Sequence, residues 1–189
     1  KLIKSECNVN EIRRNTFALY EAATKGNLRV AKLLLENGAK INLQNYHGRT
    51  ALMGAAEYEH IEILDYLLSQ KADPNLRDQS RYTALMIAVQ PSIVLEKTNL
   101  LSVVSVLLKH NADVNAKGDD GKTALFLALE RIPADPKIIR LLIDSGADPT
   151  IKIPNGESIL SLASKNGNPE IIKMIKDAIA ARQTSKTSF

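Results

Sequence analysis

The chain has 189 residues, of which 44% are hydrophobic and 24% charged, and a formal net charge of +4. This apolar content is enough for a buried core, as in ordinary globular domains. The longest apolar run, residues 100–108, is interrupted by two serines and is too short to span a membrane, so we expect no membrane insertion. Cys7 is the only cysteine, which excludes an internal disulfide and favours an intracellular location, in the cytoplasm or the nucleus.

The positive charge is concentrated at the two ends of the chain. Residues 1–40 carry eight basic and four acidic side chains, residues 41–151 carry eleven and fourteen, and residues 152–189 carry six and three. Proteins that bind nucleic acid usually cluster lysine and arginine along one face to neutralise phosphates. The sequence shows no such cluster, so we expect no nucleic-acid partner.

Five similar segments follow a lead-in at residues 1–11. We place them at about residues 12–44, 45–77, 78–117, 118–152 and 153–183, and predict a disordered tail at 184–189. Three of them contain near-identical pentapeptides, at residues 48–52 (GRTAL), 81–85 (RYTAL) and 121–125 (GKTAL). The equivalent positions are Phe17, Thr50, Thr83, Thr123 and Ser158, spaced by 33, 33, 40 and 35 residues.

Each segment predicts two short helices. In the second segment, Leu52, Ala55 and Ala56 form one apolar stripe, and residues 61, 64, 67 and 68 form another at helical spacing. Only residues 57–60 connect the two helices, so the helices are antiparallel and each pair needs a neighbouring pair to complete its core. The threonine of each pentapeptide can cap the first helix. A left-handed residue is expected after the second helix, at Gly38, Lys71, Asn111 and Gly146.

A repeat near 33 residues with this threonine-alanine-leucine pattern resembles the ankyrin repeat, over residues 12 to about 178. The resemblance implies an all-α fold, a solenoid of stacked helix-turn-helix units with projecting β-hairpin loops. It also implies a module that binds another protein, within a larger adaptor, regulator or pathogen effector. We expect a monomeric domain without a cofactor, and we take the chain, which begins with lysine, to be a piece of a longer protein.

In the ankyrin family, binding specificity lies at the loop tips and at the exposed ends of the first helices. Carried onto this sequence, those positions are Tyr46, His47, Arg49, Glu57, Tyr58, Gln79, Ser80, Arg81, Tyr82, Gln90, Asp119, Asp120, Lys122, Glu130, Arg131, Asn155 and Glu157. Tyrosine and arginine are frequent interface anchors, which favours a cluster across the second and third segments. Alternatively, the exposed tyrosines shield neighbouring loops.

Two other classes of function are weighed against protein binding. Residues 121–123 (GKT) resemble the end of a phosphate-binding loop, but Ala116 stands where that motif needs glycine. A nucleotide-sensing domain with Lys122 in its site is therefore the alternative. The three histidines fall at different points of the repeat, so no metal site is expected. No nucleophile motif or cofactor loop is present, so we expect no enzyme activity in this chain; whether the parent protein carries a catalytic domain is left open.

Two insertions interrupt the repeat at the same point, within residues 90–100 and 132–137. Residues 92–95 (SIVL) are apolar for a loop, and either dock on the neighbouring insertion or contact a partner. Asp135-Pro136 and Asn168-Pro169 predict the starts of second helices. Met53, Met86 and Phe126 follow the cap threonines; core packing is favoured for them, and an apolar strip facing a partner is the alternative.

Overall fold

The computed structural model describes residues 8–90 and 99–186. Within these residues there are ten α-helices and no extended strand, which confirms the predicted all-α class. The described chain divides into two compact units. The first unit comprises residues 8–88 and 99–113, and the second comprises residues 89–90 and 114–186.

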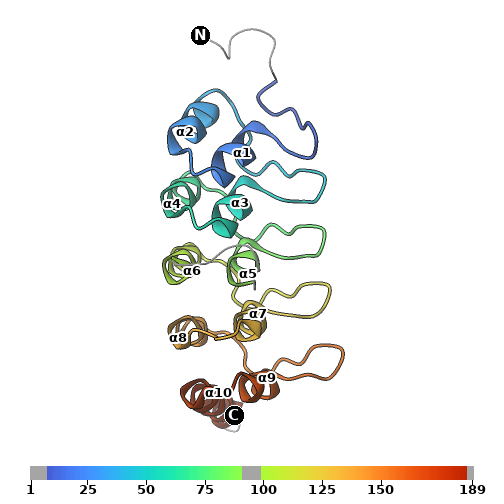
Figure 1. Ribbon diagram of the computed structural model, residues 1–189, viewed down its shortest axis with the longest axis vertical. Coiled ribbons are helices and arrows are strands. Elements are labelled where there is room, and N and C mark those ends of the chain that lie inside the picture. Colours follow the sequence, from blue (N-terminus) through green and yellow to red (C-terminus); the bar gives the residue numbers. More distant parts are fainter. Residues whose placement is uncertain (1–7, 91–98, 187–189) are drawn as a thin grey trace. The chain divides into compact units, whose positions relative to one another are not determined.

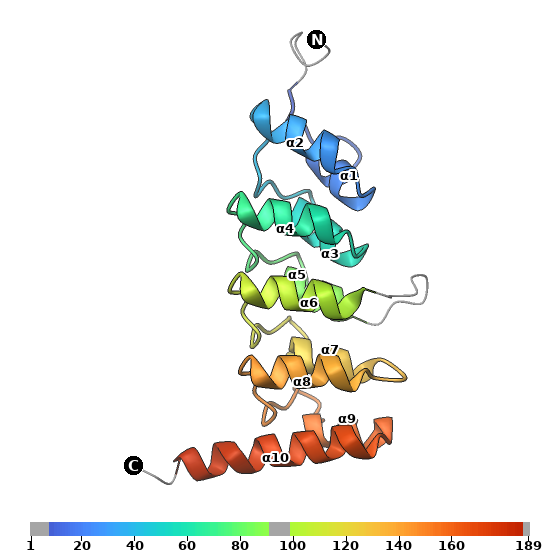
Figure 2. The same cartoon turned by 90° about the vertical axis from the view of Figure 1, so that its left-hand side faces the viewer.

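The first unit is built from pairs of antiparallel helices. Its helices are α1 (Ala18–Thr24), α2 (Leu28–Glu36), α3 (Ala51–Glu57), α4 (Ile61–Ser69), α5 (Ala84–Val89) and α6 (Leu100–Lys109). Within this unit, α1 packs on α2 and α3, and α4 packs on α2, α3 and α6. The first helices, α1, α3 and α5, lie on the side from which the loops project, and the second helices lie on the side away from the loops (Figures 1 and 2).

The second unit repeats this arrangement with two helix pairs. Its helices are α7 (Ala124–Glu130), α8 (Pro136–Asp144), α9 (Ile159–Asn166) and α10 (Pro169–Lys186). Helix α7 packs on α8 and α9, and α10 packs on α8 and α9. As predicted, Asp135 caps α8 and precedes its first-turn proline. The Asn168 side chain accepts hydrogen bonds from the first turn of α10, which also fits the prediction.

The repeated threonine fixes where each first helix begins. The hydroxyl oxygens of Thr50, Thr83 and Thr123 each accept a hydrogen bond from the backbone N–H three residues later. All three threonines are buried, so their hydroxyls satisfy backbone donors that water cannot reach. Ser158 caps α9 in the same way. The predicted caps are confirmed.

Met53, Met86 and Phe126 face the core. Each has a relative exposure of 1% or less. Each sits three residues after its cap, on helices whose residues are buried on nearly every side. The alternative of an exposed apolar strip for a partner is therefore wrong.

Four loops project before the first helices and share one closed geometry. In each loop the N–H of the first residue donates to the carbonyl oxygen four residues later, and the N–H three residues later donates back to the first carbonyl oxygen. The first residues are Asn45, Asp78, Gly118 and Ile153. The loops are hairpin turns without an extended β-ladder among the described residues. One isolated β-bridge joins Lys152 and Ser158 in the last loop. A second isolated bridge joins Arg13 and Thr16 in the turn before α1.

Asparagine side chains join successive second-helix turns. In the first unit, Asn42 Oδ1 accepts from the Asp73 N–H at 3.0 Å, and Asn75 Oδ1 accepts from the Asp113 N–H at 2.7 Å. In the second unit, Asn115 Oδ1 accepts from the N–H of Asp148 at 2.8 Å. The four residues predicted to be left-handed after the second helices have φ between 62° and 91°.

Two predictions about irregular segments have different outcomes. The tail predicted from Thr184 is wrong at its start, because α10 continues to Lys186. The Thr184 hydroxyl donates to the Ala181 carbonyl oxygen within the helix, and the Arg182 side chain donates to the Gly146 carbonyl oxygen of the turn after α8. The apolar insertion at residues 92–95 and most of the lead-in at 1–11 lie outside the described residues.

Candidate functional site

A depression of about 480 Å³ opens on the loop side of the first unit. Its walls come from the turn before α1, the loops before α3 and α5, and the ends of α1 and α3. The lining residues are Asn15, Tyr20, Asn45, His47, Arg49, Glu57, Tyr58, Asp78, Gln79 and Ser80. Six of these were predicted from the sequence: His47, Arg49, Glu57, Tyr58, Gln79 and Ser80. Asn15, Tyr20, Asn45 and Asp78 were not.

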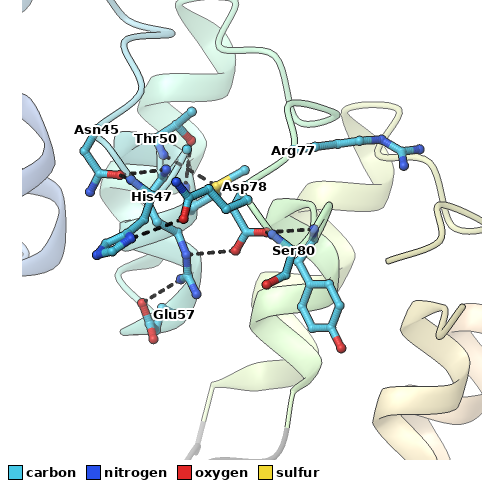
Figure 3. A network of polar contacts seen from close by, with 12 residues as sticks. Asn45, His47, Thr50, Glu57, Arg77, Asp78 and Ser80 are labelled. Carbon is cyan, nitrogen blue, oxygen red and sulfur yellow. Dashed lines mark hydrogen bonds and ion pairs between the residues drawn. The ribbon is translucent and has the colours of Figure 1, made fainter. Parts of the chain in front are cut away.

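Arg49 is the central charged residue of this depression. Its Nη1 lies 3.2 Å from Glu57 Oε2, and its Nε lies 3.0 Å from Asp78 Oδ2. Figure 3 shows the Glu57 and Asp78 side chains with these ion pairs dashed. The Arg49 side chain is 25% exposed and that of Asp78 only 7% exposed. The arginine therefore connects the end of its own first helix with the loop of the following repeat, and its position is fixed.

Asp78 also holds the shape of its own loop. Its Oδ1 accepts hydrogen bonds from the N–H groups of Ser80 and Tyr82, both at 2.9 Å. Asn45 does the same in the preceding loop, where its Oδ1 accepts from the N–H groups of His47 and Arg49. An aspartate or asparagine at this position forms a local turn with its own backbone. Asp78 thus combines a turn role with an ion pair.

The two loops of the first unit pack closely against each other. A Cβ placed on Gly48 would lie 2.8 Å from the Asp78 Cα, and Gly48 has a φ of +74°, so only glycine fits there. The backbone N–H of Gln79 donates to the carbonyl oxygen of His47, and the Gln79 side-chain amide donates to the carbonyl oxygen of Tyr46. These contacts give the depression a rigid floor.

Tyrosines supply the apolar surface around the depression. Tyr46, at the loop tip, is 66% exposed, and Tyr58 is 44% exposed. The Tyr58 ring stacks on the imidazole of His60, with ring centroids 6.4 Å apart. His60 in turn hydrogen-bonds the carbonyl oxygen of Thr24 at 3.0 Å.

Tyr20 lies deeper, beside the charged groups. Burial raises the pKa of its phenol above the ordinary value, and the nearby Glu57 carboxylate raises it further. The phenol therefore stays protonated at neutral pH. It offers one hydroxyl donor to the depression.

The predicted residues of the second unit form separate ion pairs. Lys122 Nζ lies 2.8 and 2.9 Å from the two Glu130 oxygens, and 3.8 Å from Asp120 Oδ2. Lys165 pairs with Glu157, and the Asn155 side chain accepts from the Glu157 N–H. Arg131 donates to the Gln90 carbonyl oxygen. Asp119 is exposed on the same loop as Lys122.

Three predicted anchors of the first unit lie outside the lining of the depression. Tyr46 projects at the loop tip, Arg81 is exposed with a φ of +61°, and Tyr82 is partly buried. Within the described residues, no group of three or more histidine, cysteine, aspartate or glutamate side chains could hold a metal ion. None of the described helices is both long and apolar enough to cross a membrane.

Paired short helices with capped threonines and projecting loops define a helical repeat protein. The family model that matches is described as ankyrin repeats (3 copies), and it covers residues 1–78 and 71–153. The chain therefore belongs to the ankyrin-repeat family. Ankyrin repeats are non-catalytic modules that bind other proteins, so protein interaction is the function of this fold.

Curated relatives match most of the chain but only part of their own length. An L-asparaginase of Dirofilaria immitis is 30% identical over 82% of this chain and 25% of its own length. The transient receptor potential cation channel subfamily A member 1 of Homo sapiens is 30% identical over 85% of this chain and 14% of its own length. The ankyrin repeat and KH domain-containing protein mask-1 of Caenorhabditis elegans is 31% identical over 94% of this chain and 7% of its own length. The enzyme and channel names are not carried over to this chain, which spans a quarter or less of these proteins.

The nucleotide-sensing alternative gains no support from the second unit. The Lys122 amine is held by both oxygens of Glu130. A lysine that binds phosphate must instead offer its charge to the ligand.

Proposed function

We propose that the chain binds a partner protein through the depression of the first unit and the tyrosines around it. The observation that carries this proposal is the fixed arginine: Arg49 is held by Glu57 and Asp78 beside two exposed tyrosines. Side chains that are already ordered lose little conformational freedom on binding, which favours affinity. Tyrosine and arginine are also the residue types that most often dominate binding energies.

The dimensions of the depression indicate how a partner uses it. A volume of about 480 Å³ accommodates one or two side chains of a partner segment, not a whole domain. Tyr58 lines the depression, and Tyr46 projects from the loop that also carries His47 and Arg49, so both tyrosines can contact the flanking parts of that segment. The monomeric state and the intracellular location expected from the sequence remain part of the proposal.

The test compares three purified versions of the chain in an affinity capture from parent-cell lysate, followed by mass spectrometry and a binding titration. They are the wild type, Tyr46→Ala/Tyr58→Ala, and Leu33→Ala. Leu33 is 48% exposed on α2 and is not part of the depression, so it is the matched apolar control. We expect the double variant to lose binding about tenfold or more, because each anchor contributes on the order of 1 kcal/mol or above, and the control to bind like the wild type. Equal binding by all three would place the interface elsewhere.

A further inference from the structure

We propose that the depression of the first unit receives an arginine side chain of the partner, with the Glu57 carboxylate as its acceptor. This inference rests on the proposed function and specifies the chemistry of the partner segment. It follows from the charge of the depression, the state of its carboxylate oxygens and its aromatic walls.

The charged side chains that line the depression leave it with a negative balance. Arg49 contributes one positive charge, and Glu57 and Asp78 contribute two negative charges. An acidic partner segment would meet like charge here, whereas a cationic one is attracted.

The two carboxylates are not equally available to a ligand. Asp78 is 7% exposed, its Oδ1 accepts two loop N–H groups, and its Oδ2 faces Arg49. Glu57 is 35% exposed and contacts Arg49 through Oε2. A carboxylate has acceptor capacity for several donors, so Glu57 can bind a second cation while it holds Arg49. Glu57 is therefore the acceptor that a partner reaches.

The aromatic walls favour a guanidinium over an ammonium group. A guanidinium is planar, stacks on aromatic faces, and donates two parallel N–H bonds to a carboxylate. Tyr58 is 44% exposed next to Glu57, and Tyr20 lines the same depression. A lysine would bring the same charge without the stacking or the paired donors.

The experiment uses peptide selection, because it needs no knowledge of the natural partner. The wild-type chain, Glu57→Gln, Tyr46→Ala/Tyr58→Ala and the control Glu62→Gln are immobilised separately and screened against a displayed library of random twelve-residue peptides. Glu62 is an exposed carboxylate on α4 that does not line the depression, so its variant changes the net charge equally. Circular dichroism checks that each variant is folded.

We expect peptides selected on the wild type and on Glu62→Gln to share one arginine. Replacing that arginine by the uncharged, isosteric citrulline should weaken binding to the wild type about tenfold or more, and Glu57→Gln should show a loss of the same size. The citrulline arm does not depend on any protein variant. Lysine at that position should bind with intermediate affinity.

Two kinds of failure are distinguishable. If peptides depend on Tyr46 and Tyr58 but share no arginine, carry an acidic residue instead, or bind Glu57→Gln as well as the wild type, the arginine inference is wrong and the proposed function stands. If no peptide is selected, or if binding ignores the tyrosine substitutions, the proposed function at this surface is wrong and the inference falls with it.

Discussion

Arg49 in the first unit and Lys122 in the second occupy the same position of their repeats, and their surroundings differ. Each precedes a cap threonine, and each pairs with a glutamate eight residues later, Glu57 or Glu130. Arg49 also reaches Asp78 in the loop of the following repeat, whereas Lys122 pairs with Asp120 and Glu130 of its own repeat. The same sequence position is thus a link between repeats in one unit and a local ion pair in the other.

The difference originates at the first residue of the next loop. That residue is Asp78 in the repeat after Arg49, and Ile153 in the repeat after Lys122. Isoleucine offers no acceptor, so Lys122 turns to Asp120 and Glu130. One carboxylate therefore decides whether a charged residue becomes part of a shared, rigid surface. Three experiments test this comparison.

The largest effect is expected for Asp78→Ala. This change removes the Arg49 partner and leaves two loop N–H groups without their acceptor, so it should lower the free energy of unfolding by about 2–3 kcal/mol. The control variant Asp120→Ala affects an exposed loop residue whose carboxylate accepts the Lys122 N–H, and it should cost less than about 1 kcal/mol. Urea unfolding followed by circular dichroism measures both. Equal losses would mean that Asp78 does not link the repeats.

A smaller effect is expected when the two basic residues are exchanged. Arg49→Lys keeps the charge but cannot place two nitrogen donors on two carboxylates at once, and should cost about 1 kcal/mol. Lys122→Arg should change stability by less than about 0.5 kcal/mol, because its local pairing needs only a single charge. The same unfolding assay applies, with hydrogen exchange at the Ser80 and Tyr82 amides as a local readout. If these two amides exchanged faster in Lys122→Arg than in Arg49→Lys, the proposed difference between the two basic residues would be wrong.

The smallest effect is expected at high pH. Burial, and then the Glu57 charge, raises the pKa of Tyr20 above the usual 10.0, so the folded state holds this proton longer than the unfolded state. The stabilisation is complete below pH 10 and is lost as the pH rises through the raised value. Tyr20→Phe should therefore flatten the decline in stability as the pH rises above 10.0. All five tyrosines, residues 20, 46, 58, 66 and 82, lie in the first unit, so phenol absorbance reports on that unit alone.

Repetition made most of the fold predictable from the sequence. Thr50, Thr83 and Thr123 recur at the same place, and a position that recurs in one chain has one structural role in each copy. The cap hydrogen bonds and the burial of Met53 and Phe126 followed that expectation. The start of the predicted tail was misplaced because Thr184 lies outside the repeat, where only composition was available.

The sequence predicted only some of the residues that line the depression, and Asp78 shows why the others were missed. Arg49 and Glu57 stand at variable positions of the repeat and were identified from it. Asp78 acts between two repeats, and a sequence read one repeat at a time does not show which residues meet across them. One signal was present: Asn45 and Asp78 share the position five residues before the cap threonine, where such side chains favour turns. Tyr20 carried no comparable signal.

The asparagine links between turns have a consequence for how each unit unfolds. Asn42 and Asn75 each accept the backbone N–H of the following repeat, and Asn75 also donates to the carbonyl oxygen of Asn111. Separating two neighbouring repeats therefore breaks these hydrogen bonds in addition to exposing apolar surface. A repeat that loses its neighbour loses this interface, so we expect the repeats of a unit to unfold together more than one at a time.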